Sequence, residues 1–263
     1  MQEPHLQIFP DADTLALGAA EAIAQITSQS IESRGVCSIA LSGGKTPVRL
    51  FEHIAKDYQN ALDWEKVHFF WVDERNVSQD HPDSNYRLAH ESLLRNLPIP
   101  LEHLHRIPTG RHSTIKGAER TARKYEDELA RYFESEPTED QAFDIVLLGL
   151  GTDGHTGSLI TDSDPSPFSE YTETKRAIPV WVPQLQSARI TLTADFINLA
   201  RNIIFMVSGE TKAKILKSVL EAKAVHYPAQ LIHPVSNTAT LSWLVDQAAA
   251  SLLNPDLRAS RCA

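Results

Sequence analysis

The sequence predicts an α/β fold in which a mostly parallel sheet is covered by helices on both faces. Three observations lead to this fold class. Short apolar runs alternate along the chain with longer helix-like patterns. Hydrophobic residues make up 42% of the 263 residues, which is enough for a sizeable core. Neither an internal repeat nor a long linker interrupts the alternation.

The strands are predicted from apolar runs that are short and rich in β-branched or aromatic residues. The runs VCSIALS, VHFFWV and FDIVLLGL are typical, and the last is the most strand-like run of the chain. Strands are therefore expected at residues 5–9, 36–42, 67–72, 143–150, 189–193, 202–208 and 238–245.

Helix patterns occupy the gaps between these runs. Asp11 or Asp13 can cap the first helix, and Thr46 is expected as the N-cap of the second, with Pro47 at its first helical position. Helices are expected over residues 11–33, 46–55, 83–95, 122–133, 211–221 and 246–253. The polar, proline-containing segment 161–176 is predicted to be a surface loop near a site.

Composition and charge exclude several classes of function. The net charge of −9 argues against nucleic acid or an anionic membrane as the main partner. No apolar run approaches the ~20 residues of a membrane span, and no signal peptide is recognisable, so a cytoplasmic protein is expected. Cys37 and Cys262 form neither a disulfide framework nor a zinc-binding spacing. The oligomeric state stays open.

The loop SGGKTP (42–47) follows a predicted strand and leads into a predicted helix. A nucleotide-binding P-loop is rejected, because Gly43 and Gly44 directly precede Lys45 and no earlier glycine stands at the required spacing. Two glycines still let the backbone approach an anion, and a helix start offers free N–H groups. The loop suits one phosphate group, or else is an ordinary glycine turn.

A second loop begins with Asp73, Glu74 and Arg75, directly after the run VHFFWV. Acidic groups in this position are candidates for proton transfer, and an arginine is a candidate for binding phosphate. The alternative is a surface ion-pair loop. The residues 83–85 (DSN) are interpreted as a helix cap.

A third loop, LLGLGTDGHTGS (147–158), contains the dinucleotide pattern G-x-G-x-x-G. That interpretation requires a crossover helix and another strand, and the chain instead continues into TDSDPSPF. The glycines permit tight turns that aim Asp153 and His155 at one point. Histidine is the natural general base at neutral pH, and Asp153 could orient it. The alternative is a structural histidine.

The three loops together resemble the 6-phosphogluconolactonase family, which belongs to a wider group that includes glucosamine-6-phosphate deaminases. The resemblance is carried by SGGKTP, by VDERNV with DSNYRLAHESLL, by FDIVLLGLGTDGHTGSL, and more weakly by SARITLTADFINLA and SGETKAKIL. It covers nearly the whole chain in the expected order. It implies a Rossmann-like α/β fold and a single sugar-phosphate lactonase domain over residues 1–263.

The resemblance also implies an activity and its residues. The reaction would be hydrolysis of 6-phospho-D-glucono-1,5-lactone to 6-phosphogluconate in the oxidative pentose phosphate pathway, without a metal or an organic cofactor. His155 would be the general base, with Asp153 beside it, and Asp73 would line the sugar site. The phosphate would be held by Gly43, Gly44, Lys45, Thr46, Arg75, Arg189 and Lys212. The family usually has a small or polar residue where Lys45 stands, so this lysine either adds a phosphate contact or points outward.

Two other functions are weighed against this one. The related deaminases carry a glutamate five residues after the histidine, and this chain has Ile160 there. A non-catalytic sugar-phosphate sensor would keep the phosphate loop, but the presence of both Asp153 and His155 argues against it. The absence of a serine nucleophile elbow G-x-S-x-G favours direct attack by water over an acyl-enzyme.

Overall fold

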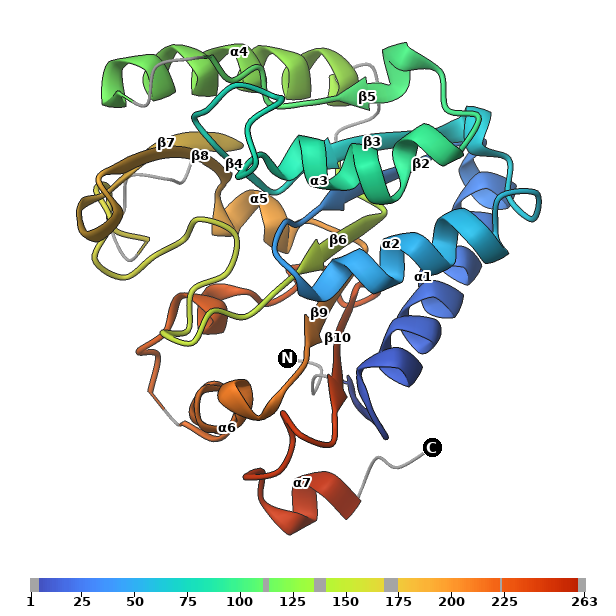
Figure 1. The fold of residues 1–263 in the computed structure, drawn as a ribbon, viewed down its shortest axis with the longest axis vertical. Coiled ribbons are helices and arrows are strands. Elements are labelled where there is room, and N and C mark those ends of the chain that lie inside the picture. Colours follow the sequence, from blue (N-terminus) through green and yellow to red (C-terminus); the bar gives the residue numbers. More distant parts are fainter. Residues whose placement is uncertain (1–4, 111–113, 135–140, 168–174, 223, 260–263) are drawn as a thin grey trace.

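The computed structural model describes residues 5–110, 114–134, 141–167, 175–222 and 224–259. Within them lies one seven-stranded sheet in which every pairing is parallel (Figure 1). Its strands, in spatial order, are β1 (His5–Phe9), β10 (Thr240–Asp246), β9 (Asn202–Val207), β6 (Ile145–Leu148), β2 (Cys37–Leu41), β3 (Val67–Trp71) and β5 (Leu104–His105). The predicted α/β class with a mostly parallel sheet is confirmed.

The helices cover both faces of this sheet. The chain moves outward from β1 through β2 and β3 to β5, and then returns through β6 and β9 to β10. Because crossovers between parallel strands are right-handed, the two directions place their helices on opposite faces. Figure 1 shows α1 (Ala12–Arg34), α2 (Thr46–Asp57) and α3 (Asn85–Ser92) on one face, with α5 (Ala194–Asn198) and α6 (Ala213–Glu221) on the other.

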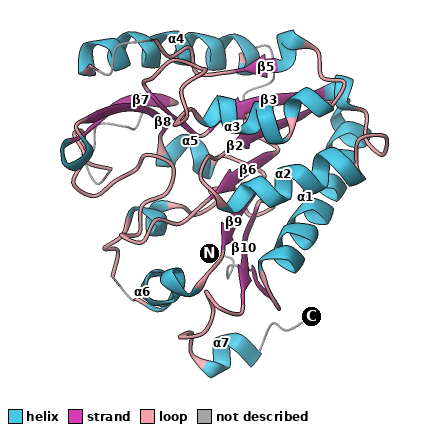
Figure 2. Ribbon diagram, in the orientation of Figure 1, coloured by secondary structure: helices cyan, strands magenta, loops and turns pink. Residues whose placement is uncertain are grey.

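A second, three-stranded antiparallel sheet was not expected from the sequence (Figure 2). It consists of β4 (Asp73–Arg75), β8 (Ser187–Leu192) and β7 (Ala177–Val182), and α4 (Ile115–Phe133) packs against β7 and β8. The sequence predicts a loop at 73–75, because three polar residues carry no strand pattern on their own. Its strand conformation comes from pairing with β8, more than a hundred residues away.

Two further expectations were wrong. No helix forms at 246–253, where Asp246 closes a series of turns by accepting from the backbone N–H of Ala249 at 2.7 Å. The short helix α7 (Pro255–Ala259) begins only after these turns. Thr46 is not the N-cap of α2: Lys45 occupies that position, and its side chain makes no capping hydrogen bond.

The core lies between the sheet and its helices. All five residues of β2 are buried, including the free thiol of Cys37, and burial raises the pKa of that thiol to about 12. Cys262 lies outside the described residues, as does the part of the predicted surface loop 161–176 that spans 168–174. No helix in the described ranges is long and apolar enough to cross a membrane.

Candidate active site

A cavity of about 510 Å³ opens at the carboxyl ends of the parallel strands. The chain direction reverses between β2 and β6, which are neighbours in the sheet but send their crossovers to opposite sides. Ligands of open α/β sheets bind at such a switch point. The cavity is lined by the loops after β2, β6 and β9, and by residues of β4 and β8. All three loops singled out in the sequence therefore meet here.

The loop after β2 forms one wall of the cavity. Gly43, Gly44, Lys45 and Thr46 all line it, together with Pro47 in the first turn of α2. Gly44 adopts a positive φ of 91°, a conformation that glycine takes at little cost. Because the N-cap residue Lys45 makes no side-chain hydrogen bond to the helix start, backbone N–H groups of the first turn of α2 remain for an anion.

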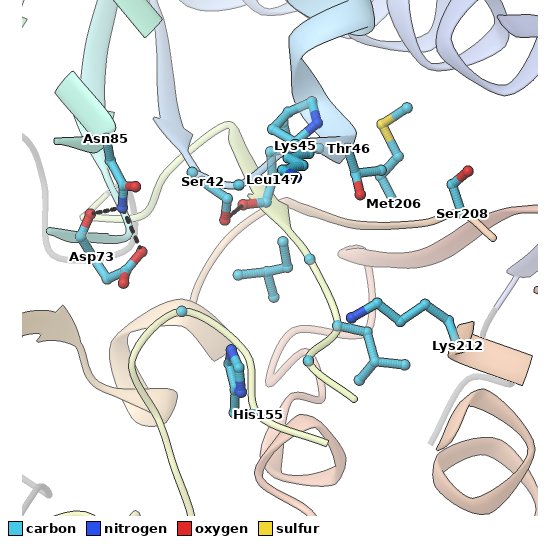
Figure 3. A pocket seen from close by; sticks show the side chains of 18 of the residues that line it. Ser42, Lys45, Thr46, Asp73, Asn85, Leu147, His155, Met206, Ser208 and Lys212 are labelled. Atoms are coloured by element: carbon cyan, nitrogen blue, oxygen red, sulfur yellow. Dashed lines mark hydrogen bonds between the residues drawn. The ribbon is translucent and has the colours of Figure 1, made fainter. Parts of the chain in front are cut away.

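The loop after β6 holds His155 against Asp153. The imidazole Nδ1 lies 2.5 Å from Asp153 Oδ1, and this hydrogen bond lowers the pKa of Asp153 to about 2. An ionised carboxylate can only accept, so Nδ1 donates its proton to Asp153, and in the neutral imidazole Nε2 keeps a lone pair. His155 lines the cavity (Figure 3), whereas Asp153 is not among the residues that line it.

Glycines make this arrangement possible. A Cβ on Gly151 would lie 2.2 Å from His155 Nδ1, so only glycine leaves room for the ring. The turn is closed by the N–H of Gly151, which donates to the carbonyl of His155 at 2.8 Å. Gly154 has a φ of +83° and packs against the ring of Tyr227.

Two arginines lie opposite each other on neighbouring strands of the small sheet. Arg75 of β4 and Arg189 of β8 are direct partners in the antiparallel register, and both line the cavity. The Nε atoms of both side chains are buried and find no hydrogen-bond partner among the described residues. Burial lowers the pKa of Arg189, and the charge of Arg75 lowers it further, while Asp73 opposes both effects. Like charges opposite each other are unfavourable, so this pair is suited to an anion.

Lys212 enters the cavity from the loop after β9 (Figure 3). This loop is fixed by Asp246, whose carboxylate accepts from Ser208 Oγ and from the N–H of Gly209. Burial lowers the pKa of Lys212, and the carboxylate of Asp153 counteracts the shift. Lys212 thus lies within electrostatic reach of the histidine–aspartate pair.

Asp73 lines the cavity, but its neighbour Glu74 does not. The carboxylate of Glu74 is buried and accepts from the N–H groups of Asn85 and Tyr86, both at 2.8 Å. It also accepts from the hydroxyl of Ser84, the N-cap of α3, so the interpretation of 83–85 as a helix cap is confirmed. Glu74 anchors the start of α3 and is not placed for proton transfer.

Sequence reasoning missed two residues at the site. Asn85 lines the cavity and donates to Asp73, and the hydroxyl of Ser158 donates to the same carboxylate at 2.5 Å. Both lie within stretches that carry the family resemblance, but no spacing rule marks them. Nowhere in the described ranges are three or more His, Cys, Asp or Glu side chains grouped so that they could hold a metal ion.

Comparison with known proteins gives concordant results. The chain is 39% identical over 254 residues to the 6-phosphogluconolactonase of a Synechocystis species, covering 96% of this chain and 99% of the relative. The structure of 6-phosphogluconolactonase from Trypanosoma brucei superposes with a TM-score of 0.84 at 28% identity, covering 97% of this chain and all of the other.

A monomeric glucosamine-6-phosphate deaminase shares the fold, with a TM-score of 0.74 at 19% identity over 94% of this chain and 99% of its own. The family model described as glucosamine-6-phosphate isomerases/6-phosphogluconolactonase matches residues 10–243. The match extends over all three cavity loops and both arginine-bearing strands. The chain therefore belongs to the family of glucosamine-6-phosphate isomerases and 6-phosphogluconolactonases.

Proposed function

We propose that this protein hydrolyses 6-phospho-D-glucono-1,5-lactone to 6-phosphogluconate within a single lactonase domain, with His155 as the general base. The observation that carries the proposal is the His155–Asp153 pair at 2.5 Å, which presents Nε2 to a cavity that also contains four cationic side chains. The names of the relatives support the same substrate.

The cations hold the phosphate of the lactone in this proposal. Arg75 and Arg189 supply guanidinium groups whose buried Nε atoms have no partner within the described ranges. Lys45 and Lys212 add positive charge from two other walls. The backbone at Gly43, Gly44 and Thr46 contributes N–H groups beside α2. Because the phosphate is remote from the reacting carbonyl, its binding energy serves to position the lactone.

The chemistry then needs one proton acceptor. His155 Nε2 takes a proton from water as the water oxygen attacks the C1 carbonyl carbon of the lactone. The tetrahedral intermediate collapses with cleavage of the bond to the ring oxygen, which leaves as the C5 hydroxyl after receiving the proton from His155. Asp153 stays ionised throughout, because its pKa is about 2, and stabilises the imidazolium.

Direct attack by water is supported by the positions of the two serine hydroxyls that line the cavity. Ser42 donates to the carbonyl of Leu147 at 2.6 Å, and Ser208 donates to Asp246. Neither hydroxyl is hydrogen-bonded to His155, so neither has the adjacent base that a serine nucleophile requires.

The deaminase alternative is disfavoured by Ile160. This residue stands where the related deaminases carry a glutamate, and it is buried in a small apolar cluster with Ile178, Val180 and Val182. A sensor function is disfavoured by the geometry of the His155–Asp153 pair, which a binding protein would not need. Ammonia release from glucosamine 6-phosphate above background would favour the deaminase.

The test is the decay of freshly generated 6-phosphogluconolactone at neutral pH, followed by acid release. We expect the wild-type protein to accelerate it and His155→Ala to lose on the order of 10²- to 10⁴-fold in kcat, the usual contribution of a general base. Binding of 6-phosphogluconate should survive in that variant, because the phosphate contacts remain.

The matched control is His53→Ala. His53 also pairs through Nδ1 with a carboxylate, Asp57 at 3.1 Å, but does so on α2 outside the cavity. This variant should retain full activity. Equal turnover by His155→Ala and His53→Ala would refute the base assignment, and no acceleration by the wild type would refute the lactonase.

A further inference from the structure

The carboxylate of Asp73 is held from both sides by side chains of two other segments. Asn85 Nδ2 donates to Oδ1 at 3.1 Å and to the backbone carbonyl of Asp73 at 2.9 Å (Figure 3). Ser158 Oγ donates to Oδ2 at 2.5 Å. Asp73 is only 5% exposed, and what remains of its surface lines the cavity.

Asn85 is wedged in place by the first loop. Its Oδ1 is buried and has no hydrogen-bond partner in the described part of the chain, and a Cβ on Gly43 would lie 1.8 Å from it. The amide therefore fills the space between the glycine backbone and Asp73. Both donor hydrogens of Nδ2 are used on Asp73, so the amide group has one orientation.

Ser158 is equally constrained. It is fully buried, and its N–H donates to Thr191 Oγ1 at 3.2 Å. Because a serine hydroxyl has a single proton, donation to Asp73 leaves only lone pairs to face Arg189, whose Nη1 lies 3.4 Å away. Ser158 thus links the Asp73 carboxylate to one of the two arginines.

These contacts limit what Asp73 can recognise. An ionised carboxylate only accepts hydrogen bonds and has about four acceptor positions, of which the two protein donors use one on each oxygen. The cavity-facing positions need a donor. In a phosphorylated sugar lactone the ring oxygen, the carbonyl and the phosphate dianion are acceptors, and only the ring hydroxyl groups donate.

We propose that Asn85 and Ser158 are positioning residues that fix the Asp73 carboxylate to accept from one ring hydroxyl of the lactone, so that lactones lacking this hydroxyl are rejected. This inference rests on the proposed function and names the feature of the substrate that the site selects. A site built to pair with a substrate hydroxyl discriminates strongly against an analogue that lacks it, because its buried polar group is left unpaired.

The experiment compares the 6-phosphogluconolactone with its 2-, 3- and 4-deoxy analogues, each generated fresh. For the wild type we expect kcat/KM to fall at least about tenfold for one analogue. In Ser158→Ala and Asn85→Ala, the ratio of kcat/KM for the parent lactone to kcat/KM for that analogue should shrink toward one. A merely structural role would lower turnover of both substrates equally and leave the ratio unchanged.

The control variant is Ser163→Ala. Ser163 is also buried, but its hydroxyl lies outside the cavity, 2.7 Å from the carbonyl oxygen of Ile160 and 3.0 Å from that of Pro165. The ratio of kcat/KM values in this variant should therefore equal that of the wild type. If the wild type turns over all three analogues within about twofold of the parent, the inference is wrong whatever the variants do. An unchanged ratio in folded Ser158→Ala and Asn85→Ala would also overturn it.

Equilibrium binding of 6-phosphogluconate and its deoxy analogues separates this inference from the proposed function. A protein that hydrolyses no lactone but prefers the hydroxylated ligand about tenfold refutes the lactonase and supports the hydroxyl contact. A protein without hydrolysis and without that preference refutes both.

Discussion

Gly43 is a position at which no side chain fits. A Cβ there would meet the amide of Asn85 at 1.8 Å, whereas a Cβ on Gly44 would meet nothing within 4 Å. Glycine is therefore needed at the two positions for different reasons. At Gly44 the backbone is in a left-handed conformation, and at Gly43 there is no space for a side chain. Any side chain at Gly43 would push Asn85 away from Asp73.

We expect Gly43→Ala to lower kcat/KM for the lactone on the order of 10- to 100-fold, because a small displacement of positioning groups has large kinetic effects. Steady-state kinetics of the variant would measure it. Gly110→Ala is the control, because a Cβ at Gly110 meets open space and the residue lies outside the cavity. Equal activity of the two variants would contradict the explanation.

The sequence allowed most of the cavity wall to be predicted, but not how its residues hold one another. His155, Asp73 and Arg75 could be found because they follow strand-like runs. The sequence marks Asn85 only as part of a helix cap and does not distinguish Ser158 from other loop serines. Their roles depend on contacts with a carboxylate 12 and 85 residues away in the chain, which no local pattern encodes.

At the scale of elements, the pleat of β4 explains why adjacent acids have different roles. Side chains alternate between the two faces of a strand. Asp73 and Arg75 therefore share the face toward the cavity, and Glu74 points to the start of α3. Had the segment been recognised as a strand, the alternation alone would have excluded Glu74 from the chemistry.

The edge of the large sheet carries a cluster of histidines between β3, β5 and α4. His68 Nδ1 lies 3.0 Å from His105 Nε2, and His105 Nδ1 lies 2.7 Å from Glu128 of α4. The His68 ring also stacks on His103, with centroids 3.8 Å apart. Burial, with added repulsion from His103 and His105, lowers the pKa of His68 to about 3.

This cluster predicts a loss of stability in mild acid. An unfolded histidine takes up a proton near its ordinary pKa of about 6.5, whereas folded His68 resists it until about pH 3. The contribution of neutral, buried His68 to the free energy of unfolding is therefore complete above pH ~6.5, and it declines as the pH falls toward about 3. Urea denaturation at several pH values between 7.5 and 5 should show this, with a shallower decline in His68→Phe.

His226→Ala, at an exposed histidine, serves as the control and should follow the wild type. The groups of α4 that face the cluster are Glu128, Arg131 and Tyr132, and they are unchanged in both variants. Identical pH dependence of unfolding in the wild type and in His68→Phe would show that this cluster does not cause the loss of stability in mild acid.

At the scale of the molecule, the candidate site joins two sheets. The loops after β2, β6 and β9 belong to the parallel sheet, while Arg75 and Arg189 belong to the antiparallel one. A phosphorylated ligand held by both would stabilise the folded protein as a whole. The parallel sheet was predictable because β–α alternation is local; the antiparallel sheet was not, because β4 and β8 lie far apart in the chain.

We therefore expect 6-phosphogluconate to raise the unfolding temperature. At a hundredfold excess over Kd, binding to the native state contributes about 2.7 kcal/mol. Differential scanning calorimetry should show a rise of several degrees in the wild type and a much smaller one in Arg75→Ala at the same ligand concentration.

Arg49→Ala is the control, because Arg49 is exposed on α2 and pairs with Asp13 away from the cavity. Gluconate without phosphate should leave all three proteins nearly unchanged. An equal rise in the wild type and in Arg75→Ala would remove Arg75 from the phosphate site.

The arrangement around Asp73 also has an evolutionary consequence. Gly43, Asn85 and Ser158 come from three separate segments, yet each constrains the same carboxylate. An exchange at one position leaves a gap, a clash or an unpaired polar group at another. Across relatives, these four positions should therefore be exchanged together or not at all, so that the site is inherited as one unit although its parts are scattered along the chain.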